Sequence, residues 1–420
     1  MLLNLSKKIK KKYPQHYKFA EFLCKNQGVH ILRNTDIPPK SQSNYPIRDH
    51  LLCSELTKKI IRYLNKGSLI GPFFKHEIPF DNYFLSPLSG LWKIYPNKVS
   101  LIQNLSAPFN HSINSCIPES LRETEYVSFE KMIGLANDVG LGGYLWIIDL
   151  KDSYFILPIL LQFIKLFGSE WFGKYIFYAC LPFGLATAPK IFQIFADILQ
   201  HILEESNEKL YFLGNIQLLF HYLDDYFSGH PNKSTAFKQF SKLLKLLQKL
   251  GIPTSEKKCT KPCQIIVILG FLLDTLSQTV SIPPEKISNY IKDIKWLLKN
   301  ISKCTIKKLE VTGGRLRHCS RAMYGGAAFL RGLEALLWQM KHILNKSDHQ
   351  PFNLSQRAKY DLEFWLEVLP EMTNKTPFKY ILKDKYQPDI TIYTDACEKS
   401  DMKGWGGIDT LGHFFFRRFS

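Results

Sequence analysis

Two adjacent carboxylates interrupt an apolar and aromatic stretch, Leu218-Leu219-Phe220-His221-Tyr222-Leu223-Asp224-Asp225-Tyr226-Phe227. Stretches of this kind are typical of a buried strand or hairpin. An ionised acid in such surroundings is costly unless it is paired or faces a cation. One interpretation is a hairpin whose tip happens to be Asp224-Asp225, since Asp is common in turns. The other is a hairpin that presents both carboxylates to divalent metal ions.

A second acidic segment decides between these interpretations. It reads Tyr144-Leu145-Trp146-Ile147-Ile148-Asp149-Leu150-Lys151-Asp152-Ser153-Tyr154-Phe155, so an apolar run leads into Asp149 and predicts a buried strand that ends in an acid. If the two strands lie side by side, Asp149 meets Asp224 and Asp225. Three gathered carboxylates repel one another unless cations neutralise them. Hard oxygen ligands of this number suit Mg²⁺, which binds through a few carboxylates plus substrate phosphates.

These residues resemble the palm of a reverse transcriptase. Tyr222-Leu223-Asp224-Asp225 is similar to the family's Y-x-D-D box, and Asp149 is similar to its first catalytic aspartate. The resemblance implies that Asp149, Asp224 and Asp225 hold two Mg²⁺ ions, or Mn²⁺ in their place, about 3.5–4 Å apart. These ions would activate the primer 3′-hydroxyl and neutralise the pyrophosphate leaving group.

The resemblance also assigns residues to the incoming nucleotide. Tyr154, five residues after Asp149, matches the aromatic ring beneath the sugar, and Asp152 lies at its matching offset in the substrate site. The turn Leu181-Pro182-Phe183-Gly184-Leu185-Ala186-Thr187-Ala188-Pro189 resembles the family's L-P-x-G-x-x-x-x-P motif beside the template and the incoming base. Phe183 and Gly184 are therefore expected to contact substrate, and glycine permits the close backbone approach that this motif needs.

Two lysines complete the implied site. Lys258, in the segment after Gly251, matches the lysine that can protonate the pyrophosphate leaving group. The hairpin that holds the triphosphate is expected over 86–106, but the family's usual arginine falls on Ser100. Lys98 lies two residues earlier, on the same side of a strand, and is the candidate to substitute. A lysine binds phosphate as a point charge, without the bidentate fork of arginine.

Composition favours a polyanionic partner. The formal net charge is +18, and nucleic acid is the commonest partner of a basic chain. The densest basic run, Lys7-Lys8-Ile9-Lys10-Lys11-Lys12, is either a solvated face or a nuclear-import or nucleic-acid signal. No uncharged apolar run reaches the roughly 18 residues of a membrane helix, so no membrane partner is expected. Nine scattered cysteines favour reduced thiols in the cytoplasm or nucleus.

Apolar periodicity divides the rest of the chain. It predicts helices over 55–64, after Pro189, over 235–250 and over 355–369. Residues 283–345 are helical in pattern and basic, which fits a thumb along a duplex backbone, although a generic helical bundle would show the same pattern. The resemblance then implies an N-terminal extension (1–50), fingers (51–140), palm (141–280), thumb (281–345), a connection (346–387) and a final segment (388–420).

The final segment resembles the opening of a ribonuclease H domain. Asp389-Ile390-Thr391-Ile392-Tyr393-Thr394-Asp395-Ala396 alternates like a strand and ends in an acid, with Asp395 at the first metal-ligand position of that fold. The other carboxylates of such a site would lie beyond Ser420, so ribonuclease H activity is not expected from this chain. The form Leu181-Pro182-Phe183-Gly184-Leu185, with Asn104-Leu105-Ser106-Ala107-Pro108 and Ser112-Ile113-Asn114, looks most like DIRS-like, tyrosine-recombinase retroelements.

We therefore expect an α+β, right-hand polymerase whose antiparallel palm sheet is backed by helices, followed by the start of an α/β ribonuclease H-like domain. The expected activity is RNA-directed DNA synthesis from deoxynucleoside triphosphates, with an RNA template and DNA primer or an RNA–DNA hybrid as partner. The alternative is a non-catalytic nucleic-acid-binding remnant of a retroelement polymerase. The set of Asp149, Asp224 and Asp225 favours the enzyme, whereas Ser100 favours the remnant. A DNA-templated polymerase on the same palm would differ only in its template.

Overall fold

The structure is a computed structural model that describes residues 49–382 apart from 94–97, 207, 324, 345 and 373–375. It also describes 392–399, 402–419 and, before residue 48, positions 14, 18, 29, 31, 40–44 and 47. The basic run Lys7–Lys12 lies outside the described residues. The chain forms two compact units, Met1–Gln278 and Thr279–Ser420.

Unit 1 is built on a four-stranded antiparallel sheet. Its strands are β11 (Thr260–Cys263), β4 (Tyr144–Asp149), β10 (Asp225–His230) and β9 (Phe220–Tyr222), in that spatial order. The apolar run of β4 is buried from Leu145 to Ile148, because protein covers both faces of this strand. β9 and β10 form the hairpin that the sequence predicts, joined by Leu223 and Asp224.

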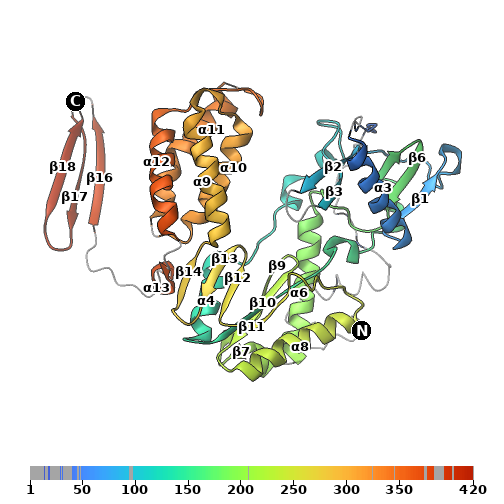
Figure 1. The fold of residues 1–420 in the computed structure, drawn as a ribbon, viewed down its shortest axis with the longest axis horizontal. Helices are drawn as coiled ribbons and strands as arrows, with labels where there is room; N and C mark the ends of the chain where they lie inside the picture. Colours follow the sequence, from blue (N-terminus) through green and yellow to red (C-terminus); the bar gives the residue numbers. More distant parts are fainter. Residues whose placement is uncertain are drawn as a thin grey trace. The chain divides into compact units, whose positions relative to one another are not determined.

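Helices pack against this sheet. α6 (Ala188–Ser206) packs on β9, and α8 (Lys233–Lys249) packs on β4 and β10 (Figure 1). Gln239 of α8 accepts a hydrogen bond from the Trp146 indole at 3.1 Å and donates one to the Gly229 carbonyl at 3.2 Å. α4 (Phe129–Val139) packs at the far end of β4 and β10, where Val139 lies against Gly229.

The remaining elements of unit 1 include a second antiparallel sheet and two hairpins. The sheet consists of β1 (Leu69–Phe73), β6 (Lys174–Tyr178) and β5 (Gly168–Trp171). The hairpins are β2 (Leu88–Lys93) with β3 (Lys98–Gln103), and β12 (Ile265–Ile268) with β13 (Phe271–Asp274). The other described elements are α3 (His50–Asn65), α5 (Leu161–Ile164), α7 (Glu208–Tyr211), β7 (Phe212–Leu213), β8 (Ile216–Gln217) and the short helices η2 (Lys75–Glu77), η3 (Asn114–Cys116), η4 (Glu119–Leu121) and η5 (Ser153–Ile156).

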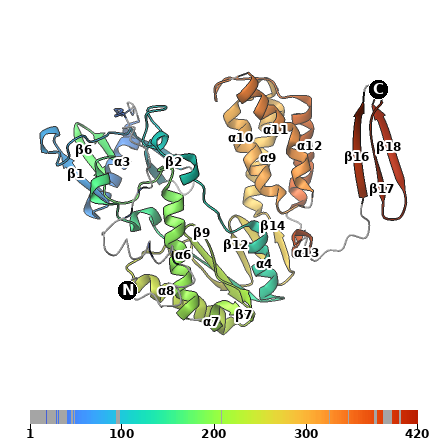
Figure 2. The same cartoon turned by 180° about the vertical axis from the view of Figure 1, so that it is seen from behind.

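Unit 2 contains a helical bundle and a separate antiparallel sheet. The long helices α9 (Pro284–Lys299), α10 (Ile306–Ser320), α11 (Arg331–Trp338) and α12 (Gln356–Glu371) run side by side in both views of the ribbon (Figures 1 and 2). The short elements η6 (Ile301–Lys303), η7 (Gly326–Leu330) and η8 (Gln339–Ile343) lie between them in sequence, and α13 (Phe378–Ile381) follows. β14 (Thr279–Ser281) pairs with β15 (Thr376–Pro377), and the last sheet is β16 (Ile392–Lys399), β17 (Met402–Asp409) and β18 (Phe414–Phe419).

The predicted helices are confirmed, with differences at their ends. α3 begins at His50 instead of residue 55, because the Asp49 side chain accepts hydrogen bonds from the backbone N–H groups of Leu51 and Leu52. The segment 283–345 is not one helical stretch but three α-helices with short 3₁₀ and π segments between them. The fold class is thus a mixture of helices and antiparallel sheets, as predicted.

Candidate active site

The pairing of β4 with β10 brings the three acids together. Asp225 lies directly opposite Asp149 in the antiparallel register, and the Leu150 N–H donates to the Asp224 carbonyl at 2.9 Å. Side chains alternate between the faces of a strand. Asp149 therefore points away from the face of Trp146 and Ile148, which pack into the core. The carboxylates lie on the opposite face, at the end of the sheet that α4 does not cover.

Burial makes the negative charges of this site costly. Only 3% of Asp149 is exposed. Burial, the charges of Asp224 and Asp149, and a hydrogen bond with Asp149 raise the pKa of Asp225 to about 7. Burial also raises the pKa of Asp224, and the charge of Asp149 adds to that shift. The site therefore holds more carboxylates than its own positive charge can neutralise.

Lys258 supplies the positive charge that the structure does place here. Its Nζ atom lies 2.6 Å from Oδ2 of Asp149. The segment before it is fixed against the end of β4, because the Ser255 N–H donates to the Asp149 carbonyl at 2.8 Å. Partial burial alone would lower the pKa of Lys258, but the hydrogen bond and the charge of Asp149 outweigh burial and raise it. Sequence position selected Lys258, and the structure places this lysine on the first aspartate.

The donor chemistry fits Mg²⁺, although the side chains do not form a finished metal site. Within the described ranges, no group of three His, Cys, Asp or Glu side chains is arranged to hold an ion. Hard carboxylate oxygens are nevertheless the ligands that Mg²⁺ prefers, and the raised pKa of Asp225 marks a deficit of positive charge. A metal ion at this site would compete with Lys258 for the Asp149 carboxylate.

Tyr154 lies in an aromatic group next to the carboxylates. Its ring is 4.9 Å from that of Phe183 and 5.5 Å from that of Phe192, measured between centroids. Burial, followed by the charges of Tyr126 and Asp224, raises the pKa of Tyr154. The phenol is therefore neutral at physiological pH. The structure thus brings two predicted substrate residues, Tyr154 and Phe183, into contact.

The predicted turn at 181–189 is held by Asn114, which the sequence analysis did not select as a site residue. Asn114 donates to the Gly184 carbonyl at 2.8 Å and accepts from the Ala186 N–H at 2.8 Å. Gly184 has φ +94°, and a Cβ atom there would lie 3.3 Å from the Gln103 carbonyl. The backbone conformation therefore favours glycine, and a Cβ atom would also crowd the Gln103 carbonyl. An asparagine in a polar loop gives no signal in the sequence that it contacts a turn 70 residues away.

Asp152 is a predicted substrate residue that forms ion pairs away from the three carboxylates. It has a left-handed backbone, φ 51°, and pairs with Arg62 of α3 (Nη2 at 3.6 Å) and with Lys66 just after that helix (Nζ at 3.1 Å). Lys98 begins β3 and lies opposite Lys93 in the β2–β3 hairpin. Asp395 lies in β16 opposite Gly406. The side chains of Lys98 and Asp395 lie outside the described atoms, so their predicted roles stay predictions.

Two polar residues behind the hairpin, His221 and Asp197, were not predicted as site residues. His221 of β9 contacts Asp197 of α6 at 2.9 Å, and only 5% of His221 is exposed. A histidine next to Tyr222 was visible in the opening stretch, but its partner could be found only from the packing of α6. Tyr126 likewise stacks near Tyr222, with ring centroids 4.9 Å apart.

Comparison with known proteins identifies the central domain. Residues 102–273 match the family model of reverse transcriptase (RNA-dependent DNA polymerase), so the chain contains a reverse transcriptase domain. The Pro-Pol polyprotein of simian foamy virus type 1 is 25% identical over 284 residues, which are 64% of this chain and 21% of the polyprotein. The chain spans about a fifth of the length of this curated relative.

Solved structures of foamy viral protease-reverse transcriptase share the fold. A complex of the form designated dRH with double-stranded DNA has a TM-score of 0.60 and 18% identity, and the match covers 100% of this chain and 66% of that chain. A complex with an RNA/DNA hybrid has a TM-score of 0.58 and 16% identity, and the match covers 100% of this chain and 51% of that chain. Another complex with double-stranded DNA has a TM-score of 0.59 and 18% identity, and the match covers 100% of this chain and 79% of that chain. None of the helices that the structure describes has the length and apolar character needed to span a bilayer.

Proposed function

We propose that this chain is an RNA-directed DNA polymerase that works by two-metal nucleotidyl transfer. The observation that carries the proposal is the register of β4 and β10, which sets Asp149 opposite Asp225 with Asp224 in the adjoining turn. The reverse transcriptase domain at 102–273 contains all three residues. A remnant without catalytic function would not need three partly or fully buried acids in one place, two of which, Asp224 and Asp225, have pKa values raised by burial and by nearby carboxylates.

The three carboxylates would bind Mg²⁺, or Mn²⁺ in its place, which when bound supplies Lewis-acid activation of the primer 3′-hydroxyl and charge neutralisation of the leaving group. In the transfer, the 3′-oxygen forms a bond to the α-phosphorus as the bond from that phosphorus to the pyrophosphate oxygen breaks. Lys258 lies within reach of this site. Once it releases Asp149, its ammonium group can donate a proton to the departing pyrophosphate.

Tyr154, Phe183 and Gly184 would form the wall against the incoming nucleotide. The contact between Tyr154 and Phe183 gives a rigid apolar surface, and the positive φ of Gly184 keeps that turn free of a side chain. Lys66 and Arg62 bring two cations to Asp152, three residues after Asp149. Base selection would come from pairing with the template.

Unit 2 offers a surface for a nucleic-acid backbone. A groove of about 400 Å³ between α9 and α10 is lined by Trp296 together with Lys292, Lys307 and Lys308. Lys308 lies over the indole ring of Trp296. An aromatic face flanked by lysines suits a sugar–phosphate backbone. The foamy viral structures that share this fold hold double-stranded DNA or an RNA/DNA hybrid, which supports the same partners here.

We also propose the finer organisation that the sequence predicted. Residues 51–140, 141–280 and 281–345 would act as fingers, palm and thumb, and 388–420 would begin a ribonuclease H-like domain. A DIRS-like origin is supported by the sequence motifs at 104–108, 112–114 and 181–185 alone. The described cysteines are all free thiols, in keeping with action in the cytoplasm or nucleus.

Primer extension on matched RNA and DNA templates tests the proposal. The purified chain, with Mg²⁺ and deoxynucleoside triphosphates, should extend a DNA primer on the RNA template. Extension on DNA alone would indicate a DNA-templated polymerase. Tight duplex binding without extension on either template would indicate the non-catalytic alternative and refute the proposed activity.

A further inference from the structure

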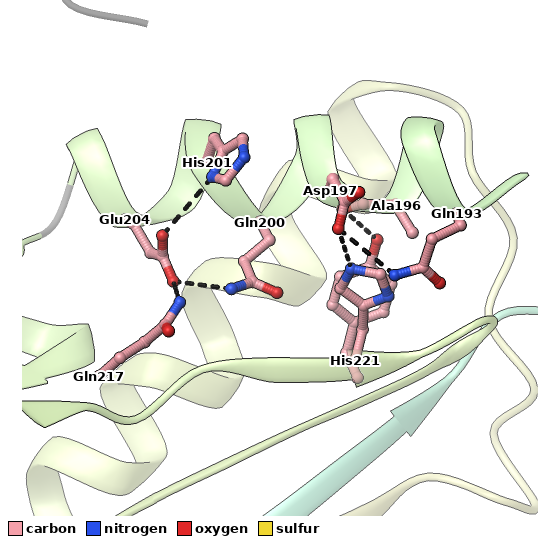
Figure 3. Close-up of polar contacts among 9 residues, drawn as sticks. Gln193, Ala196, Asp197, Gln200, His201, Glu204, Gln217 and His221 are labelled. Carbon is pink, nitrogen blue, oxygen red and sulfur yellow. Dashed lines mark hydrogen bonds and ion pairs between the residues drawn. The ribbon is translucent and has the colours of Figure 1, made fainter. Parts of the chain in front are cut away.

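The β9–β10 hairpin is fastened to helix α6 by one polar contact on each strand. On β9, Nε2 of His221 lies 2.9 Å from Oδ1 of Asp197. On β10, the Tyr226 hydroxyl donates to the backbone carbonyl of Ala196 at 3.0 Å. Figure 3 shows His221 directed at Asp197 from the strand below the helix. Two consecutive residues of α6, Ala196 and Asp197, therefore form polar contacts with the two strands of the hairpin.

The register explains why both contacts lie behind the carboxylates. His221 and Tyr226 are directly opposite each other in the β9–β10 ladder, and their rings lie 5.3 Å apart. Residues that are paired across two strands point to the same face of the sheet, which here is the face of α6. Asp225 precedes Tyr226 and points to the other face. The hairpin is held from one side while its acids face the other.

The turn between these contacts needs such support. Leu223 has φ 51°, a left-handed conformation that a residue with a Cβ atom adopts only under strain. Asp224 follows Leu223 directly, so the position of Asp224 depends on a strained turn that would relax without support. Metal ligands must be held within about 0.5 Å of their working positions.

We propose that the His221–Asp197 contact is a positioning device that fixes Asp224 and Asp225 for metal binding. Neither residue touches substrate or metal; His221 acts through the hairpin, and Asp197 acts through His221. The inference rests on the proposed function, because it presumes that the carboxylates bind the catalytic ions. Loss of a group that orients metal ligands typically weakens metal binding about 10- to 100-fold.

A second polar group on α6 provides the matched control. Glu204 accepts hydrogen bonds from Gln200 at 2.9 Å and from Gln217 of β8 at 2.5 Å, as Figure 3 shows. This contact also joins α6 to a strand through a largely buried acid. Gln217 lies seven residues before Asp224 in sequence and outside the β9–β10 hairpin. If the polar contacts of α6 only stabilise the fold, the two groups should behave alike.

Three variants of the full chain test the proposal: His221→Leu, His221→Gln and Gln217→Leu. The readouts are amide hydrogen exchange of peptides spanning 220–226, Mn²⁺ binding by calorimetry, and kcat and KM for primer extension. His221→Leu should speed exchange in the hairpin and weaken Mn²⁺ binding about tenfold, lowering kcat more than it raises the KM for nucleotide. His221→Gln should keep hairpin exchange and Mn²⁺ binding within about twofold of the wild-type values, because the glutamine amide can donate to Asp197. Gln217→Leu should leave hairpin exchange and Mn²⁺ binding unchanged.

The proposal is overturned if His221→Leu leaves hairpin exchange and Mn²⁺ binding unchanged, if glutamine is as damaging as leucine, or if Gln217→Leu does the same damage. Should His221→Leu fail to fold, Asp197→Ala against Asp197→Asn makes the same comparison, since only asparagine keeps an acceptor. Exchange and Mn²⁺ binding do not depend on catalysis. A chain that shows these shifts but extends no primer refutes the proposed function and leaves the positioning role standing.

Discussion

At the scale of single residues, the site is governed by how much negative charge it must hold. Asp149 is nearly inaccessible. Burial and the charge of Asp149 raise the pKa of Asp224, and burial with the charges of Asp224 and Asp149 raises that of Asp225. Such groups oppose folding when they ionise, since the folded protein disfavours their charged form. Replacing one of these acids by a neutral residue should therefore lower the rate of catalysis without lowering the stability of the fold.

Asp224→Asn should lower kcat for primer extension at least about a hundredfold, because a metal ligand supplies several kcal/mol of transition-state stabilisation. The same change should leave the melting temperature in metal-free buffer at pH 7 unchanged or higher. The sign follows from the raised pKa: above the unfolded value, ionised Asp224 costs folding free energy, and asparagine does not. Extension at the wild-type rate would show that Asp224 is not a catalytic ligand.

Tyr154→Ala should increase ribonucleotide incorporation relative to deoxyribonucleotide. A rigid ring where the 2′-oxygen would lie can reject that group by a clash, which mere binding cannot do. The ratio of kcat/KM for the two sugars with the same base should shift about 10-fold or more, with some loss of overall rate. Tyr154→Phe is the control, because it keeps the ring and should keep the ratio. An unchanged ratio in an active Ala variant would exclude the ring as the gate.

At the scale of elements, the groove between α9 and α10 differs from the basic surface that the sequence predicted. The basic pattern of 283–345 in the sequence includes the four arginines Arg315, Arg317, Arg321 and Arg331. In the structure, Arg315 pairs with Asp293 and Arg317 with Glu334, so part of this charge joins helices to one another. The groove that contains Trp296 is lined by lysines, Lys292, Lys307 and Lys308, and by none of these arginines.

Trp296→Ala should weaken binding to an RNA–DNA duplex about tenfold, since an aromatic contact to the backbone contributes more than about 1 kcal/mol. Trp338→Ala is the matched control, because Trp338 is an exposed tryptophan of the same unit and does not line the groove. Fluorescence anisotropy at a fixed salt concentration measures both. Equal effects of the two substitutions would mean that the groove is not a binding surface.

Local patterns were enough to predict the elements that carry the site. An apolar run ending in Asp149 and a hairpin around Asp224 and Asp225 each follow from period and composition, and the register then joins them. The contacts between distant segments leave no such local pattern. Lys258 lies 109 residues from Asp149 in sequence and was assigned to the site by the family resemblance alone, and His221 meets Asp197 only because α6 packs on β9. Side-chain partners of this kind are set by packing, which leaves no periodic signal.

At the scale of the whole molecule, the net charge of +18 should dominate association with nucleic acid. Each neutralised phosphate releases counterions, so log Kobs should fall linearly with log salt concentration. We expect a slope steeper than about −4 for an RNA–DNA duplex, corresponding to roughly five or more phosphate contacts. The measurement is a titration of affinity between low and physiological salt. A slope shallower than about −2 would show that the charge of the chain is not engaged.

The ion pair between Lys258 and Asp149 supplies the most deeply buried of the three acids with a cation from the chain itself. Under the proposed function, Mg²⁺ would take over that counterion role at Asp149. The ammonium group would then be free to pair with the triphosphate, which brings its own negative charge to the same place.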